Sequence, residues 1–97
     1  MKSVMIIFNQ AHTEKVDYML DYYNVRGFTK WNEVYGRGSQ EGPPHMGTHT
    51  WPEKNHAILA VVQDNKVDDI LDTVQKIDAV NTEVGIRAFV WNIERMV

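Results

Sequence analysis

Three of the four histidines of this 97-residue chain lie within twelve residues of one another, at His45, His49 and His56. Imidazole nitrogen is a good ligand for zinc, copper and nickel, and carboxylates complete many such sites. Glu41 and Glu53 lie in the same part of the chain and could supply oxygen ligands. The pattern therefore indicates a candidate transition-metal site formed by His45, His49, His56 and Glu41. The alternative is that these are ordinary solvated histidines of a surface loop.

The histidine-bearing segment does not have the sequence of a helix. Pro43, Pro44 and Gly47 interrupt it, and the glutamate of an H-E-x-x-H metal motif is missing. Loop ligands would have to become ordered when the ion binds, or would come in part from a neighbouring subunit. Residues 38–55, GSQEGPPHMGTHTWPEKN, show neither helical nor strand periodicity. Loops of this length are uncommon in compact domains and tend to be functional or disordered.

Two alternating glycines, Gly36 and Gly38, come just before and at the start of this loop. Such a spacing can bring backbone N–H groups close to an anion. The alternative is that the glycines only allow a strand to bend into the loop.

A tryptophan stands at the tip of the loop, where Trp51 is followed by Pro52. Because tryptophan is enriched among the residues that dominate protein–protein binding energy, Trp51 is a candidate anchor for a partner protein. Packing of the loop onto its own domain is the competing interpretation.

Composition limits the class of protein. The net charge of −3 and the scattered distribution of the ten lysines and arginines argue against nucleic-acid binding. The chain has no cysteine, which excludes disulfides and zinc–thiolate sites. The apolar run near the N-terminus is too short for a transmembrane helix and lacks a cleavage site, so we expect no membrane insertion and a cytoplasmic protein. Residues 1–97 are expected to form a single domain.

The elements that must position these residues alternate between strands and helices. A helix is expected to begin near Thr13 as its cap and to end at Gly27, and a second helix is expected to be capped by Asn65. Their apolar stripes have the spacing of one helical face. The stripes are Val16, Met19, Leu20 and Tyr23 in the first helix, and Val67, Ile70, Leu71, Val74 and Ile77 in the second. Strands are expected at residues 4–8, 28–37, 56–63 and 87–93.

This order, β-α-β, loop, β-α-β, predicts a ferredoxin-like α+β fold with an antiparallel sheet and both helices on one face. The first and third strands are then central. Both of these strands are apolar on both faces, although the helices can cover only one face of the sheet. Because exposed aliphatic surface favours association, we expect the open face to be buried against other subunits. A sheet curled over its own loop is the alternative.

The stretch from Gly27 to Gly42, GFTKWNEVYGRGSQEG, resembles the signature of the PII signal-transduction family, with one extra residue between Thr29 and Glu33. The matching residues are Gly27, Thr29, Glu33, Val34, Gly36, Gly38, Gln40 and Gly42. The resemblance implies a homotrimer whose sheets pack inward, with residues 38–55 as the family's mobile T-loop. It places Gln40 where that loop meets a small-molecule cleft between subunits. With Gly36, Gly38, Arg37 and Trp31, Gln40 forms the candidate ligand-binding set.

The departures from the family pattern place the chain with the divergent PII-like and CutA-like proteins. The tip, GTHTWPE, has no tyrosine for uridylylation, and NTEVGIR replaces the longer glycine-rich, lysine-bearing loop that grips ATP phosphates. Ser39 stands where nucleotide-binding members usually have arginine, and the basic C-terminal segment is missing. ATP and ADP are therefore weaker ligand candidates than a transition metal. Some members of the group are encoded beside heavy-metal efflux pumps, which suggests a membrane transporter as the partner.

The leading hypothesis is thus a non-enzymatic PII-like regulator that binds a small ligand or metal ion and presents its loop to a partner protein. A small enzyme is the competing class. Acylphosphatases need a phosphate-gripping arginine loop that IFNQAHTEK lacks, whereas ferredoxin-like monooxygenases line a cavity with residues that Trp31, Tyr22 and His12 could supply. His12 is more simply a residue at the start of the first helix. A passive metal-binding protein is the third possibility.

Overall fold

Two helices and four long strands alternate along the chain in the expected order. They are β1 (Lys2–Asn9), α1 (Thr13–Tyr22), β2 (Phe28–Val34), β5 (Asn55–Val62), α2 (Val67–Val80) and β6 (Ile86–Asn92). Short 3-10 turns, η1 (Gln10–His12) and η2 (Asp64–Lys66), precede the helices, and β3 (Gly36–Arg37) pairs with β4 (Pro44–His45). This computed structural model describes residues 1–37, 44–45 and 54–97.

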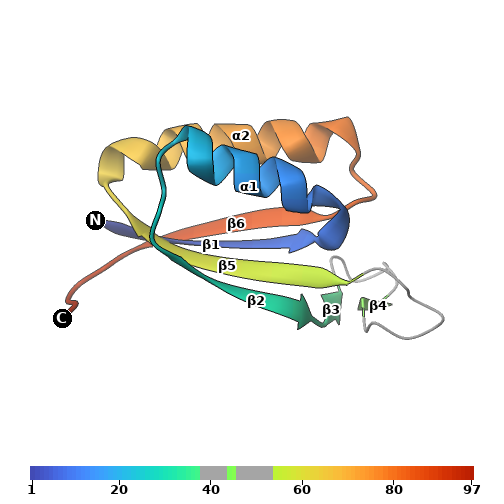
Figure 1. Cartoon of the computed structure of the whole chain (residues 1–97), viewed down its shortest axis with the longest axis horizontal. Coiled ribbons are helices and arrows are strands. Elements are labelled where there is room, and N and C mark those ends of the chain that lie inside the picture. The colour runs from blue at the N-terminus through green and yellow to red at the C-terminus, as the bar shows by residue number, and fades with distance from the viewer. Residues whose placement is uncertain (38–43, 46–53) are drawn as a thin grey trace.

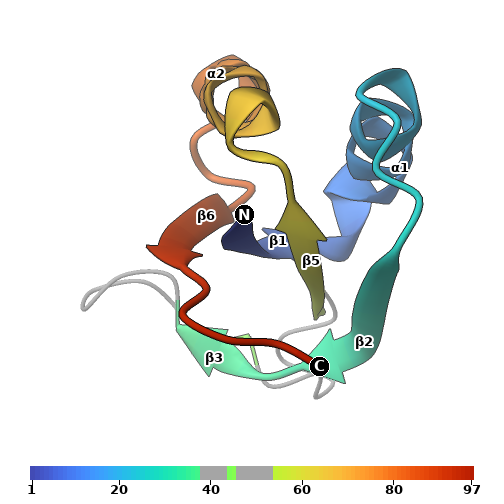
Figure 2. The ribbon, with the colours of Figure 1, turned by 90° about the vertical axis from the view of Figure 1, so that its left-hand side faces the viewer.

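The four long strands form one antiparallel sheet in the order β2-β5-β1-β6. The first strand of the chain and the strand after the long loop are therefore central, as predicted. Both helices lie on the same face of this sheet, and the views in Figures 1 and 2 show them side by side above it. The predicted ferredoxin-like α+β fold is confirmed.

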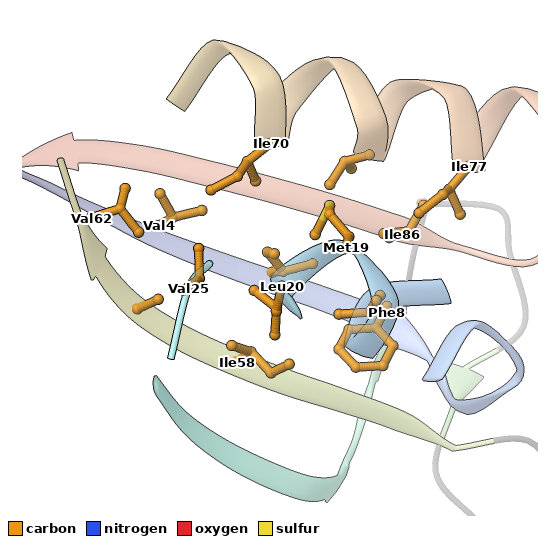
Figure 3. Close-up of a cluster of buried hydrophobic side chains, with 14 residues drawn as sticks. Val4, Phe8, Met19, Leu20, Val25, Ile58, Val62, Ile70, Ile77 and Ile86 are labelled. Atoms are coloured by element: carbon orange, nitrogen blue, oxygen red, sulfur yellow. The ribbon is translucent and has the colours of Figure 1, made fainter. Parts of the chain in front are cut away.

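The hydrophobic core lies between the helices and the sheet (Figure 3). Alternate residues of each central strand point toward the helices because side chains alternate between the faces of a strand. Most residues of the predicted helix stripes lie in this core, whereas Tyr23 and Val67 are partly buried against it and Leu71 is not part of it. Phe8, Ile6 and Ile58 are among the largest fully buried side chains. The remaining members of the cluster are Val4, Val16, Met19, Leu20, Val25, Ala60, Val62, Ile70, Val74, Ile77 and Ile86.

The helix ends differ from the prediction. α1 begins at Thr13 itself with His12 in the cap position, and the Thr13 hydroxyl donates to the carbonyl of Gln10 at 2.6 Å instead of capping the helix. Asn65 lies inside the turn η2, so it does not cap α2, which begins at Val67. In both places a 3-10 turn links the strand to the helix and supplies the start that a capping side chain would otherwise provide.

The end of α1 is also displaced from the predicted Gly27. The helix ends at Tyr22, and Asn24 adopts a positive φ of 58° just beyond it. Asparagine tolerates this left-handed conformation better than most residues. The Val25 N–H then donates to the carbonyl of Leu20 at 2.7 Å, which closes the turn before Gly27 is reached. Neither helix within the described part of the chain is long and apolar enough to cross a membrane.

The face of the sheet opposite the helices is largely apolar, and neither helix covers it in the part of the chain that the structure describes. Met5 lies between Leu59 on β5 and Phe89 on β6, and all three side chains point to this face. The side chains of Phe89, Trp91 and Trp31 on this face are 51%, 46% and 45% exposed. Phe89 and Trp91 are therefore not part of the core within the protomer. The predicted two-faced apolar sheet is present, with one face left open.

Candidate functional site

Both ends of the long loop meet at one end of the sheet, where β2 stops and β5 starts. Val34 lies opposite Asn55 across these two strands. Asn9, at the end of β1, and Gln10 after it form backbone hydrogen bonds with the connection before β6 and with the residue before β5. The N–H of Gln10 donates to the carbonyl of Lys54 at 2.7 Å, and the N–H of Asn9 donates to the carbonyl of Gly85 at 2.8 Å. We call the two ends of the loop, around Val34 and around Lys54 and Asn55, the loop base. The loop base and residues 81–85 are therefore neighbours, at the right-hand end of the sheet in Figure 1.

Glu33 connects the strand that enters the loop with the strand that leaves it. The pairing of β2 with β5 is irregular between Trp31 and Val34, and Glu33 has a positive φ of 60° within this bulge. Its N–H donates to Nδ1 of His56 at 3.2 Å, and its carboxylate accepts a hydrogen bond from Nζ of Lys54 at 3.0 Å. A non-glycine residue in this conformation is uncommon and persists where its surroundings hold it.

His56 is partly buried at this junction and packs edge-on against Phe8, with ring centroids 5.7 Å apart. Because Nδ1 accepts the Glu33 N–H, the proton of the neutral ring lies on Nε2. Desolvation lowers the pKa of His56 below its ordinary value of 6.5, and the positive charge of Lys30 lowers it further. Glu33 and Asp17 act in the opposite direction but do not outweigh these effects. The neutral ring is thus the form that fits the folded protein.

His12 has a structural role. It is 4% exposed, and its Nε2 lies 2.8 Å from the carbonyl oxygen of Val84. The carbonyl can only accept, so Nε2 carries the proton and donates. The bond fixes the start of α1 to the connection before β6.

The predicted ligand-binding residues are distributed between described and undescribed parts of the chain. Gly36 pairs with His45, and Arg37 pairs with Pro44, in the small β3–β4 sheet. A methyl group added at Gly36 would meet no atom of the described residues within 4 Å, so their packing does not demand glycine there. Trp31 lies on the open face of the sheet, opposite Ala57. Gly38 and Gln40 lie outside the described residues.

The predicted metal ligands are not brought together by the residues that the structure describes. His56 is engaged with Glu33, and of His45 the structure describes only its backbone pairing in β4. Glu41 and His49 lie outside the described residues, as does Glu53, and so does the predicted partner anchor Trp51. Within residues 1–37, 44–45 and 54–97, no group of three or more histidine, aspartate or glutamate side chains could hold a metal ion. The metal site stays a prediction.

The residues suggested for a monooxygenase cavity are separated by the fold. Trp31 lies on the face of the sheet away from the helices. His12 is buried at the start of α1, and Tyr22 is exposed at the end of that helix. These three side chains therefore do not line one cavity between the sheet and the helices.

Sequence reasoning did not identify the pairing of Glu33 with Lys54 or a role for Arg87. The signal for the first was present, since a glutamate and a lysine stand on either side of the loop. Arg87 lies on the open face next to the loop end of the sheet, opposite Ile7, and is exposed. Arg87 therefore places a positive charge near the loop base, whereas the charge of Lys54 is paired with that of Glu33.

Comparison with known proteins gives a consistent picture. The family model for nitrogen regulatory protein P-II matches residues 1–97. No curated protein gives a significant match. Among solved structures, CPII from Thiomonas intermedia K12 bound to ADP and bicarbonate is similar with a TM-score of 0.77 and 26% identity, covering 95% of this chain and 84% of that one.

The same protein bound to ADP, AMP and acetate is similar with a TM-score of 0.72 and 25% identity, covering 92% of this chain and 81% of that one. A PII-like signalling protein from Thermus thermophilus is similar with a TM-score of 0.65 and 17% identity, covering 95% of this chain and 85% of that one. This last similarity is one of fold.

Proposed function

The chain belongs to the nitrogen regulatory protein P-II family, and on that premise we propose that it is a trimeric, non-enzymatic PII-like regulator. It binds an adenine nucleotide together with a small anion and presents residues 38–55 to a partner protein. The ligand class follows CPII, which is similar over most of the chain and was solved with ADP and bicarbonate. That similarity favours ADP and AMP over the transition metal suggested by the histidine spacing.

The observation that carries the proposal is the uncovered apolar face of the sheet. Phe89, Trp91 and Trp31 expose about half of their surface there, around the more buried Met5 and Leu59. A contiguous apolar face of this kind marks an interaction surface. Packing of other copies against it would remove this surface from water, at about 25 cal/mol for each Å² of apolar area. The trimer is the closed assembly that the family resemblance implies.

The ligand site of the proposal is the loop base. This end of the sheet combines the two ends of the loop with residues 81–85 and lies beside the open face that carries Arg87. Arg87 and Arg37 are the proposed phosphate contacts, because guanidinium groups bind phosphate with two parallel hydrogen bonds. The free space at Gly36 would let a ligand or a neighbouring protomer approach the backbone closely.

Regulation would work through the order of the loop. A ligand that binds the loop base favours the loop conformations that contact it, and partner affinity changes with that population. Trp51 is the proposed anchor for the partner, and a membrane transporter is the partner class that the family resemblance suggests.

Isothermal calorimetry tests this function directly. ADP, AMP, ADP with bicarbonate, and zinc are titrated into the wild type, Arg87→Gln and Arg26→Gln. The last substitution removes the same charge at the opposite end of the sheet, where Arg26 donates a hydrogen bond to Asn24. We expect ADP to bind the wild type and Arg26→Gln equally, and Arg87→Gln about tenfold more weakly or worse, as for a lost charged hydrogen bond.

The zinc titration tests the competing hypothesis of a metal site. If the metal hypothesis is right instead, zinc binds the wild type and fails to bind a His45→Ala/His49→Ala variant. Absence of heat with every nucleotide would contradict the proposed function.

A further inference from the structure

The helix layer, on the other side of the sheet from the open face, carries a groove. An open groove of about 700 Å³ lies between α1 and α2. Its floor is formed by the buried Met19 and Ile77, and its walls include Tyr18 and Tyr22. Figure 2 shows the two helices side by side, with the sheet beneath them, so that the outer surface of the helices faces away from the sheet. Subunits packed on the open face of the sheet would leave the groove accessible.

Three tyrosines form the aromatic wall of the groove. The rings of Tyr18 and Tyr22 are stacked with centroids 6.1 Å apart, and Tyr23 meets Tyr22 edge-on at 5.1 Å. Tyr18 and Tyr22 are 71% and 69% exposed, although they lie next to a mostly apolar groove. The hydroxyls of Tyr23 and Thr73 are 2.7 Å apart and join the two helices. The groove thus offers the aromatic faces of Tyr18 and Tyr22 to a ligand, and the Tyr23–Thr73 hydrogen bond joins its two sides.

The charge of the helix layer identifies the kind of ligand. α1 has three acidic residues and one basic residue, and α2 has four acidic and one basic. The two helices therefore carry a net charge of −5, whereas the whole chain carries −3, so the rest of the chain carries +2. Glu14 and Lys15 both line the groove, and Asp69 lies one helical turn before the lining residue Thr73 on α2. The net negative charge of the protein is therefore carried by the two helices that form the groove.

We propose that the α1–α2 groove binds a basic amphipathic helix of a partner protein. Apolar side chains of that helix would contact Met19 and Ile77, and its lysines or arginines would lie over the rings of Tyr18 and Tyr22 and beside Glu14. Aromatic faces attract such cations, and grooves between helices accept a third helix through its apolar face. This surface is separate from the loop, so the protein would have two partner-binding sites.

The test uses a fluorescent peptide of leucine and lysine with helical spacing, about four turns long, and a matched peptide in which glutamate replaces every lysine. Binding to the full chain is followed by fluorescence anisotropy. A Tyr18→Ala/Tyr22→Ala variant removes the aromatic wall. Tyr35→Ala is the matched control, because Tyr35 is an exposed tyrosine in the link between β2 and β3. Both changes are at exposed positions and should leave the thermal unfolding temperature unchanged.

We expect the lysine peptide to bind the wild type and Tyr35→Ala with the same affinity, and the double variant at least about tenfold more weakly, as for hot-spot tyrosines. The glutamate peptide should bind at least about tenfold more weakly than the lysine peptide, and added salt should reduce that difference. Amide shifts in a ¹⁵N-labelled sample should fall on α1 and α2. Absence of binding, equal binding of both peptides, or equal binding by the double variant would overturn the proposal.

Discussion

The backbone N–H of Glu33 donates to Nδ1 of His56 at 3.2 Å, across the two strands that enter and leave the long loop. This bond connects a strained backbone position to a titratable ring. It makes the loop base sensitive to pH, because a protonated ring has no lone pair on Nδ1 to accept the bond.

The first prediction concerns the pKa of His56, which should be below 6.5 in the folded protein because of desolvation and the charge of Lys30. An NMR titration of the ring protons measures it. Lys30→Gln should raise this pKa toward 6.5, whereas Lys76→Gln, on the exposed side of α2, should leave it unchanged. A folded pKa at or above 6.5 would contradict the burial and contacts assigned to this ring.

The second prediction is the consequence for stability. Between the folded pKa and 6.5 the unfolded chain binds more protons than the folded chain, so the free energy of unfolding falls as the pH drops through this window. Below the folded pKa this contribution levels off. Urea unfolding at about pH 7.5 and about pH 5.0, on either side of the ordinary histidine pKa, should show a larger loss in the wild type than in His56→Gln. An equal loss in both proteins would mean that His56 does not contribute to the pH dependence.

The third prediction isolates the backbone strain at Glu33. Glu33→Gly and Glu33→Ala both remove the carboxylate that contacts Lys54, and they differ in their tolerance of a φ of 60°. Glycine adopts this conformation freely, whereas alanine pays about 1 kcal/mol or more. Glu33→Gly should therefore be more stable than Glu33→Ala by about that amount in urea unfolding, the reverse of their order in an ordinary strand. If alanine gives the more stable variant, the backbone at this position is not strained.

The sequence predicted the fold well because the information was local and periodic. The stripe from Val16 to Tyr23 and the alternation of Val4, Ile6 and Phe8 each specify a buried face, and together they leave one face of the sheet open. The predicted caps Thr13 and Asn65 are each one residue from the observed caps, His12 and Lys66, because two short 3-10 turns, which have no periodic signature, precede the helices.

The candidate site was less predictable from sequence. Glu33, Lys54 and His56 meet where a bulge shifts the register of β2 against β5, and their residue types alone do not indicate which of them pair across it. The sequence did not predict a groove formed by tyrosines, although Tyr22 was considered for an enzyme cavity. Tyr23 belongs to the predicted core stripe, whereas Tyr18 and Tyr22 lie beyond it, and only the spacing of the two helices turns them into a wall.

The fourth prediction concerns the open face. Phe89→Asp places a charge on the apolar face and should separate the subunits without unfolding the protomer, because Phe89 is not part of the core cluster. Tyr18→Asp is the matched aromatic-to-acid change on the helix layer and should leave the assembly intact. Sedimentation velocity distinguishes the two. Dissociation by Tyr18→Asp and not by Phe89→Asp would place the subunit interface on the helices instead.

The native mass of the wild-type protein tests the central claim most directly, since the ligand site and the presented loop both depend on subunits meeting at the open face of the sheet. Light scattering after gel filtration at micromolar concentration should give about 34 kDa, three times the 11.3 kDa of one chain. A stable species of 11.3 kDa at that concentration would contradict the account.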